Sequence, residues 1–168
     1  MTALPRFYST GRWGQIHGRR LGETGPLMHQ SPLSSVQFAA AMPFLAANGC
    51  RSLALDTPGY GLSDGPPEPV AIADYAAALI DTLDGLGIEK AVIVGHHTGA
   101  AIGARFAAAY PARVEKMVLN GVPLFTPEEL AFFGTMRIGP TVIREDGGHL
   151  LEAWERGLKS SPGWDDLR

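Results

Sequence analysis

The 168 residues have the length of one domain, and a 45% share of hydrophobic residues is enough for a folded core. The formal net charge of −3 leaves no surplus of Lys and Arg to neutralise phosphates, which argues against a nucleic-acid partner. The single cysteine, Cys50, excludes an internal disulfide and a metal site built from thiolates, and we expect it to be buried and inert. The first residues lack the apolar run of a signal peptide, and no stretch reaches the roughly 18 apolar residues of a membrane span. We therefore expect a cytoplasmic protein without a membrane partner.

The N-terminal part of the sequence predicts two strands and a helix. We expect a strand over 12–20 with a turn at 22–25, a very short strand over 26–29, and a helix from 34 or 35 to about 47. Ser34 or Ser35 would cap the start of this helix, and Asn48-Gly49 would end it. Pro43 inside the helix predicts a kink or an early stop.

The middle of the sequence alternates between apolar strands and alanine-rich helices. The expected elements are a strand over 51–56, a helix over 72–86, a strand over 91–94, a helix over 100–110 and a strand over 114–119. Continuous apolar runs such as 91–94 are typical of parallel strands that are covered on both faces. This order predicts an α/β fold with a mostly parallel sheet and flanking helices.

The composition changes after Gly121. Prolines become frequent, and only residues 130–133 and 150–158 have a helical pattern. We therefore expect a core domain over 1–122 and a separate helical segment over 123–168.

The segment most informative about function is the junction at residues 95–99 (GHHTG), between an apolar strand and an alanine-rich helix. A sharp strand-to-helix turn holds its central residue in a strained conformation and brings backbone segments together, so small flanking residues are required. Such a turn lifts the side chain of His97 above the sheet and directs the helix N-terminus at the same place.

This junction resembles the nucleophile elbow of the α/β-hydrolase family, whose pattern is Gly-x-nucleophile-x-Gly. Residues 28–32 (MHQSP) resemble the family's oxyanion loop, 55–64 (LDTPGYGLSD) resemble its Asp-x-Pro-Gly-x-Gly-x-Ser loop, and 118–123 (VLNGVP) resemble the start of its cap. The resemblance covers about residues 12–125. It implies an incomplete α/β-hydrolase core with a partial helical cap over 123–168. It also implies ancestral hydrolysis of small apolar esters, epoxides or haloalkanes, and no cofactor.

The resemblance also implies which residues form a site. His97 occupies the catalytic nucleophile position, and Gln30, Ser31 and Thr98 would form the oxyanion and ligand-binding part. We expect the N–H groups of Ser31 and Thr98 to converge near the His97 side chain, because a tetrahedral oxyanion needs two such donors. No metal is expected.

Four departures from the family pattern bear on activity. The nucleophile position holds His97 instead of Ser, Asp or Cys, Gln30 replaces the usual Gly, and the strand over 26–29 is about three residues short. The family's acid and histidine follow a seventh and an eighth strand, and we find neither strand in the sequence. His149 has two interpretations: a polar turn with Glu145 and Asp146 that opens a helix, or, less favoured, the catalytic histidine.

The remaining polar residues have structural interpretations. We expect His29 to be a hydrogen-bonding residue of its loop, and His17 to be an exposed strand residue. Asp56 and Asp64 should fix the 55–64 loop by accepting hydrogen bonds from backbone N–H groups.

Three functional hypotheses follow. The chain is an inactive or nearly inactive hydrolase relative, an unorthodox enzyme in which His97 is the base or the nucleophile, or a non-catalytic protein that binds a small apolar molecule. Oligomers could form through an exposed sheet edge or through the cap.

Overall fold

The computed structural model describes residues 4–21, 26–28, 33–135 and 143–159. They belong to two compact units, Met1–Leu124 and Phe125–Arg168, which are described separately. That these units correspond to a hydrolase core and a cap stays a prediction.

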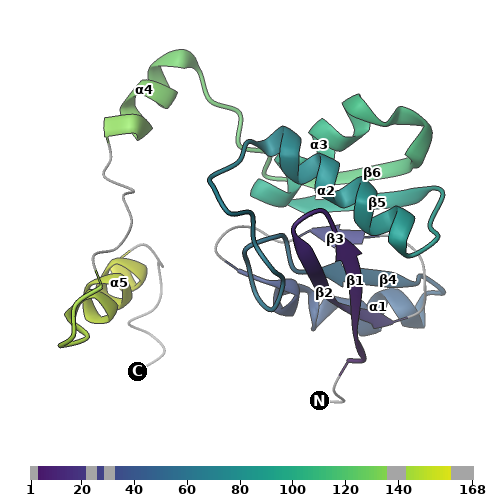
Figure 1. Cartoon of the computed structure of the whole chain (residues 1–168), viewed down its shortest axis with the longest axis horizontal. Coiled ribbons are helices and arrows are strands. Elements are labelled where there is room, and N and C mark those ends of the chain that lie inside the picture. The colour runs from purple at the N-terminus through teal and green to yellow at the C-terminus, as the bar shows by residue number, and fades with distance from the viewer. Residues whose placement is uncertain (1–3, 22–25, 29–32, 136–142, 160–168) are drawn as a thin grey trace. The chain divides into compact units, whose positions relative to one another are not determined.

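The first unit is built on a six-stranded sheet with the strand order β1-β2-β4-β3-β5-β6 (Figure 1). Its strands are β1 (Arg6–Gly11), β2 (Gly14–Leu21), β3 (Pro26–Met28), β4 (Ser52–Leu55), β5 (Ala91–His96) and β6 (Val114–Asn120). β1 pairs antiparallel with β2, and β2 with β4, whereas β4, β3, β5 and β6 run parallel to one another. The expected α/β class with a mostly parallel sheet is confirmed.

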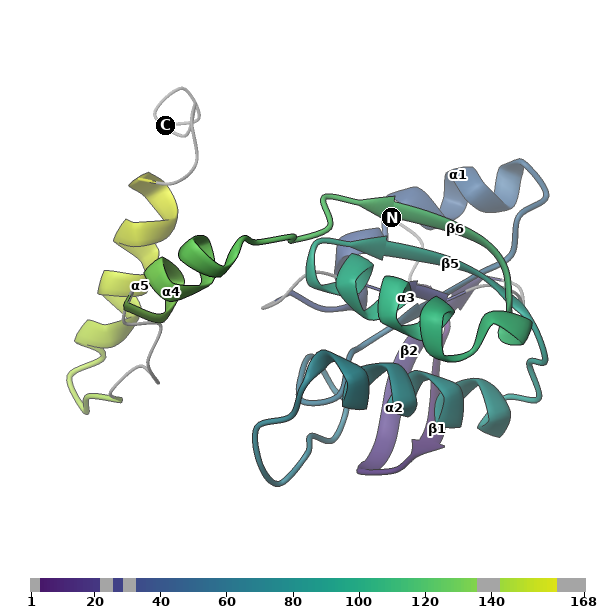
Figure 2. The same cartoon turned by 90° about the horizontal axis from the view of Figure 1, so that it is seen from above.

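Helices cover both faces of this sheet (Figure 2). The helices of the first unit are η1 (Ser35–Phe38), α1 (Ala41–Ala47), α2 (Ile72–Gly85), α3 (Thr98–Ala109) and the short η2 (Pro111–Arg113). The larger core lies under α2 and α3, where Leu83, Ile93 and Phe106 are fully buried. A smaller cluster around Met42 and Ala54 lies under α1. The parallel strands are apolar on both sides because helices pack on both faces of the sheet.

The N-terminal hairpin corrects the expected strand over 12–20. Arg12 and Trp13 form the turn, β2 begins only at Gly14, and β1 was not expected at all. The turn is fixed by tertiary contacts: Arg12 Nε lies 2.6 Å from Asp81 Oδ2 on α2, and Trp13 packs edge-on against a tyrosine of the same helix. The alternation of apolar and polar residues within one segment carries no information about such contacts. The turn expected at 22–25 lies outside the described residues.

The expected helix over 34–47 consists of two pieces. Ser34 caps η1 with its side-chain oxygen, and α1 starts separately at Ala41. Pro43 lies in the first turn of α1, where an N–H has no acceptor within the helix, so proline costs no hydrogen bond there. Pro43 therefore marks the start of a helix and not its kink. Gly49, with φ of +75°, follows the end of α1 as expected.

The other expected elements of the first unit agree with the structure to within two residues at each boundary. Cys50 is an exception to the expected burial: it lies in the exposed turn between α1 and β4 and is itself exposed. The neighbouring residues 48–51 are all exposed, so no part of the first unit covers the Cys50 side chain.

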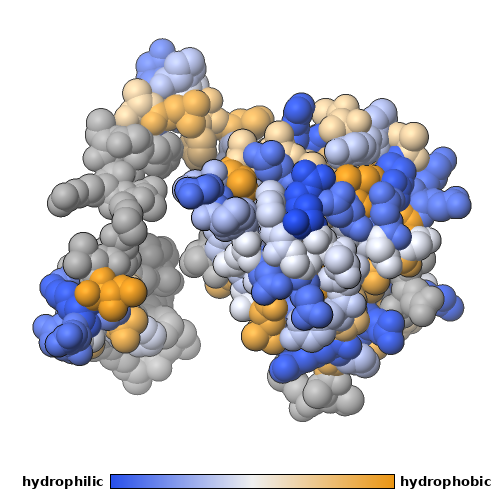
Figure 3. All heavy atoms as spheres, in the orientation of Figure 1, coloured by the Kyte–Doolittle hydropathy of each residue, from blue (hydrophilic) through white to orange (hydrophobic). Residues whose placement is uncertain are grey.

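The second unit contains α4 (Pro127–Thr135) and α5 (Gly148–Lys159). Apolar side chains gather on the surface of both helices (Figure 3). Those more than half exposed include Leu130, Phe132, Leu150, Leu151 and Trp154. Across the described parts of both units, no helix has the length and apolar character required to cross a membrane.

The core under α3 predicts a large difference between two phenylalanines. Phe106 is 0% exposed and Phe44 is 74% exposed. Phe106→Ala should lower the free energy of unfolding by about 3–5 kcal/mol, because it leaves a cavity. Phe44→Ala should change it by less than about 0.5 kcal/mol. Denaturant unfolding of both variants tests this, and similar losses would contradict the assigned core.

Candidate functional site

The turn between β5 and α3 holds His97 in an unusual backbone conformation. His97 has φ of 50° and ψ of −111°, and it is the one non-glycine residue with positive φ in the described ranges. Its N–H donates to the carbonyl of Asn120 at 2.8 Å, and its own carbonyl accepts from Ala100 and Ala101. His97 thus lies on a tight turn at the carboxyl end of β5, where open parallel sheets commonly bind ligands. This placement agrees with the sequence prediction.

A glycine makes this turn possible. A Cβ at Gly95 would collide with the carbonyl of Gly99 and with the backbone of Ala100, so α3 can start this close to β5 only without a side chain there. Further along α3, a Cβ at Gly103 would come within 3.0 Å of Ile93. Small residues therefore bring the N-terminus of α3 against the end of β5 and place His97 between them.

The side chain of His97 is exposed, and its Nδ1 lies 3.4 Å from Oγ1 of Thr98. Thr98 is the first residue of α3, and the first N–H groups of a helix have no acceptor within it. The helix dipole adds a partial positive charge at the same place. The turn can therefore stabilise a negatively charged oxygen. Among the described residues, the contact with Thr98 Oγ1 is the one hydrogen bond of the His97 imidazole.

The neighbouring His96 is directed elsewhere. Gln37 Nε2, on η1, donates to His96 Nδ1 at 2.6 Å, and the imidazole is half-buried. This bond ties β5 to η1 and occupies one ring nitrogen of His96. His96 therefore has a structural partner on η1.

Gln30, Ser31 and His29 lie outside the described residues. The convergence of the Ser31 and Thr98 N–H groups therefore stays a prediction. The structure does fix where this loop begins: Met28, the last residue of β3, pairs with Gly95 of β5. β3 therefore ends beside the strand that leads into the His97 turn.

His149 belongs to the second unit and has a local role. Its Nδ1 accepts a hydrogen bond from the N–H of Arg144 at 3.1 Å, and Asp146 Oδ1 accepts from the N–H of Gly148 at 2.9 Å. The guanidinium of Arg144 also pairs with Glu152 one turn into α5. These contacts make the segment a polar turn that opens α5, the favoured of its two interpretations.

The structure corrects the expectation for His17. Instead of being exposed, His17 is fully buried in β2, and its Nδ1 lies 2.7 Å from Oδ2 of Asp56, which is also buried. The imidazole of His17 lies against the ring of Tyr8 on β1 and the carboxylate of Asp56 after β4, and the residue pattern within β2 carries no information about these contacts. The contact links the N-terminal hairpin to the loop after β4, and no motif around His17 indicated it.

Asp56 and Asp64 fix the loop after β4, as expected. Asp56 accepts hydrogen bonds from the N–H groups of Ser35 at 2.6 Å and Leu62 at 2.9 Å. Asp64 Oδ2 accepts from the N–H of Gln15 at 2.8 Å. Burial alone would raise the pKa of Asp56, but the hydrogen bonds from Ser35, Leu62 and His17 outweigh it and hold that pKa below its ordinary value of 3.8. Asp56 is therefore an ionised structural centre of the first unit.

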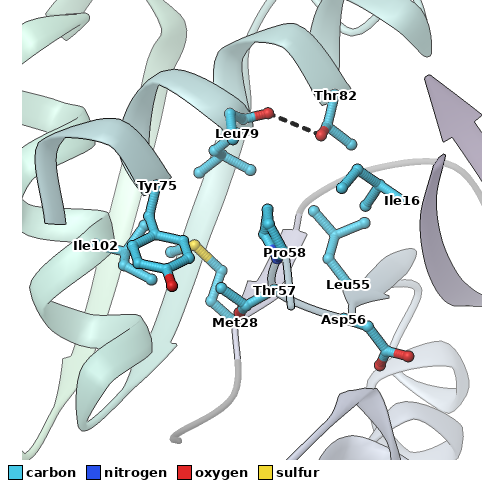
Figure 4. Close-up of a pocket in the computed structure, with 11 residues that line it drawn as sticks. Ile16, Met28, Leu55, Asp56, Thr57, Pro58, Tyr75, Leu79, Thr82 and Ile102 are labelled. Atoms are coloured by element: carbon cyan, nitrogen blue, oxygen red, sulfur yellow. Dashed lines mark hydrogen bonds between the residues drawn. The ribbon is translucent and has the colours of Figure 1, made fainter. Parts of the chain in front are cut away.

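A cavity of about 20 Å³ lies between the loop after β4 and helices α2 and α3 (Figure 4). Its walls include Met28, Leu55, Tyr75 and Ile102, and Asp56 directs its carboxylate away from the other labelled side chains. This volume is about that of one water molecule. His97 and Thr98 are not among its lining residues, so it is a packing void and not the expected ligand site.

The parallel sheet and the glycine-flanked turn define a class of protein, and comparison with known proteins identifies the family. The sequence profile of the family described as "alpha/beta hydrolase fold" matches residues 27–164. The chain belongs to the α/β-hydrolase fold family.

Individual relatives match part of their own length. Over 122 residues the chain is 35% identical to bifunctional epoxide hydrolase 2 of Mus musculus, covering 68% of this chain and 21% of that protein. Two solved structures are 26% identical: haloalkane dehalogenase from Bradyrhizobium elkani (TM-score 0.65) and epoxide hydrolase A from Mycobacterium thermoresistibile (TM-score 0.68). They cover 71% and 79% of this chain and 42% and 44% of theirs. The chain thus spans less than half the length of these proteins.

Metal ligation has no candidate in the described ranges, where no three His, Cys, Asp or Glu side chains cluster as a metal ion would need.

The lowered pKa of Asp56 predicts a pH dependence of stability. An acid whose pKa is lower in the folded state stabilises the fold above its unfolded pKa, and this contribution is lost as the pH falls through the folded value. The free energy of unfolding should therefore fall as the pH decreases below about 4. Asp56→Asn should remove part of this dependence and cost about 1–3 kcal/mol at neutral pH. Denaturant unfolding across pH measures both effects.

The matched control is Glu68→Gln, which changes an exposed carboxylate in the same connection between β4 and α2. It should leave the pH dependence nearly unchanged. An Asp56→Asn variant with the wild-type pH profile would show that Asp56 does not hold the loop as an ion.

Proposed function

We propose that this chain is a hydrolase relative that keeps a binding site for a small apolar molecule at the β5–α3 turn and has at most trace hydrolytic activity. In this proposal the turn is the nucleophile elbow of the family, and the ancestral activity is hydrolysis of small apolar esters, epoxides or haloalkanes. The names of the relatives, which include epoxide hydrolases and a haloalkane dehalogenase, support this substrate class.

The observation that carries the proposal is the surroundings of His97. Acyl transfer through a triad needs a nucleophile, a base within hydrogen-bond reach, and a group that orients the base. Within the described residues the His97 ring bonds only to Thr98 Oγ1, which is neither a base nor an orienting carboxylate. His96 is bonded to Gln37, and His149 accepts a backbone N–H in its own turn. Among the described residues, the site therefore has a position for a nucleophile without the parts that would activate one.

The size of the expected defect follows from other hydrolases. Losing triad members costs about 10⁴- to 10⁶-fold in rate, and the remaining rate comes from binding and the oxyanion hole. The N-terminus of α3 is still present to stabilise an oxyanion, so a trace activity is consistent with the geometry.

Two features favour the alternative in which His97 acts as base or nucleophile. His97 is exposed, and it is held at positive φ, a strained conformation that is common at functional sites. An imidazole can also attack acyl groups without a triad. The alternative differs from the main proposal in one result, which is whether turnover depends on the His97 ring.

Ester hydrolysis by purified wild type, His97→Ala and His97→Ser distinguishes the two. We expect trace turnover by the wild type that His97→Ala does not reduce. His97→Ser should not restore activity, because a hydroxyl there still has no base. His149→Ala is the matched control, since it removes an imidazole of the second unit. Robust wild-type turnover that is lost in His97→Ala would refute the inactive assignment and favour catalysis by His97.

Ligand binding is tested separately by thermal unfolding with small esters, epoxides and haloalkanes. A ligand at 100 times its Kd should stabilise the fold by about 2.7 kcal/mol, without being consumed. His97→Ala should reduce this shift, and His149→Ala should not. If no compound of these classes shifts the melting temperature, the chain does not bind such ligands.

A further inference from the structure

The N-terminal hairpin places two arginines directly opposite each other. In the antiparallel pairing of β1 with β2, Arg6 is the partner of Arg19, and the register continues without a bulge to Gly11. Directly opposed residues of such a pair have Cβ atoms about 4.5–5.5 Å apart, and like charges at this distance destabilise the pairing. The hairpin therefore holds two cations together at an energetic cost.

This arginine pair lies on the face of the sheet that η1 and α1 cover. Alternate side chains of a strand point to the same face, so the neighbours at positions 17 and 21 of β2 show where Arg19 points. His17 meets Asp56, whose carboxylate also binds the N–H of the first residue of η1. Leu21 packs on the buried cluster of Met42, which lies under α1. Arg19 therefore lies on this face, and Arg6 lies beside it on β1.

Within the described ranges no acidic side chain neutralises the arginine pair. The sequences of β1, β2, η1 and α1 contain no Asp or Glu. Asp56, the acid after β4 on the same face, already binds His17 and two backbone N–H groups. The arginines that form ion pairs in the described residues are Arg12, Arg113 and Arg144. Arg6 and Arg19 are thus cations whose charge is balanced by no other described residue.

The burial of Arg19 distinguishes the pair from two ordinary surface arginines. Arg6 is exposed, whereas Arg19 is half-buried, and its Nε is buried without a hydrogen-bond partner among the described residues. A buried donor on a charged group costs more when it is unpaired than a neutral donor does. An acceptor that reaches this guanidinium would therefore remove a desolvation cost as well as the repulsion from Arg6.

We propose that Arg6 and Arg19 together bind one phosphate monoester group. Each guanidinium offers a planar fork of N–H donors that fits two oxygens of such a group. A phosphate monoester carries a charge of about −1.5 to −2 at pH 7 and three acceptor oxygens, so one group can neutralise both cations and accept from both forks. A carboxylate carries a single charge and would neutralise one of the two. The formal net charge of −3 argues against an extended polyanion, which favours an isolated phosphate.

The arginine pair is separate from the His97 turn. β4 and β3 lie between β2 and β5, the strand that leads into His97 (Figure 2). β6, the last strand of the first unit, is at the opposite edge of the sheet from β1, so strands added beyond β6 would extend the sheet away from the hairpin. Phosphate binding therefore does not depend on the function proposed for His97, and a failure of either proposal leaves the other unaffected.

Titration calorimetry of the full chain with glycerol phosphate, at constant ionic strength, tests the proposal. We expect binding at one site, and at 100 times its Kd the ligand should raise the melting temperature by about 5–10 °C. Sodium chloride at the same ionic strength should not produce this shift, because screening alone is common to all ions. Arg6→Gln and Arg19→Lys should each weaken binding about tenfold or more, since each removes a charge-assisted fork.

The stability of Arg6→Gln without ligand gives an independent readout. Because this variant removes the repulsion from Arg19, its melting temperature in phosphate-free buffer should equal or exceed that of the wild type. An arginine with a purely structural role would lower the melting temperature when replaced. Loss of binding in a variant that is at least as stable as the wild type therefore assigns Arg6 to the ligand.

The matched control is Arg20→Gln. Arg20 is exposed and follows Arg19 in β2, but it points to the opposite face, where it lines a hollow with Leu53 and Leu86. This variant should bind glycerol phosphate as the wild type does. If Arg20→Gln weakens binding as much as Arg6→Gln does, the effect is one of overall charge and the proposal is overturned.

Cosedimentation with phosphatidylcholine vesicles, with and without phosphatidic acid, distinguishes the two sources of a phosphate monoester. Binding of glycerol phosphate without vesicle binding assigns the site to a small soluble molecule. Binding that requires phosphatidic acid and is lost in Arg6→Gln assigns it to a lipid headgroup. A wild type that binds neither probe, or that binds either one as well after Arg6→Gln, overturns the proposal.

Discussion

The close approach of α3 to the end of β5 is the constraint on which the candidate site depends. Gly95 allows this approach, since any side chain there would collide with the backbone of Gly99 and Ala100. The chain must then turn within one residue, and His97 takes a positive φ that costs a non-glycine residue conformational energy. Two kinds of hydrogen bond offset part of that cost. The N–H of His97 donates to the carbonyl of Asn120, and the carbonyl of His97 accepts from N–H groups in the first turn of α3. The position of His97 is thus a consequence of backbone packing and does not depend on what its imidazole does.

A second constraint holds the neighbouring loop. The buried pair of His17 and Asp56 joins the N-terminal hairpin to the loop after β4, and the same carboxylate collects N–H groups from η1 and from that loop. One ionised side chain therefore orients three segments that are distant in sequence. The hydrogen bond between Gln37 and His96 connects η1 to β5 in a similar way. The carboxyl edge of the sheet is organised by these contacts as much as by strand pairing.

These constraints separate the shape of the candidate site from its chemistry. The turn, the helix N-terminus and the loop after β4 are all maintained by structural bonds that do not need a reactive side chain at position 97. A histidine can therefore occupy position 97 without disturbing the fold, which is why family membership and hydrolytic activity are separate questions for this chain. The chain also spans less than half the length of the epoxide hydrolases and the haloalkane dehalogenase compared above, so activities of whole relatives are proposals here.

The sequence by itself determined the parallel α/β core and the position of His97. Both depend on local patterns: continuous apolar strands, alanine-rich helices, and two glycines at a spacing that only a tight turn requires. The loop roles of Asp56 and Asp64 also followed from local turn chemistry. Local patterns failed for the hairpin turn at Arg12 and Trp13, for the burial of His17 and for the division of the 34–47 helix into two pieces before Ala41. In the first two cases the decisive partners, Asp81 and Asp56, lie 69 and 39 residues away in the chain. The tertiary structure alone decided these features, because burial and ion pairing depend on which strands and helices become neighbours, and the periodicity of a single segment carries no information about that.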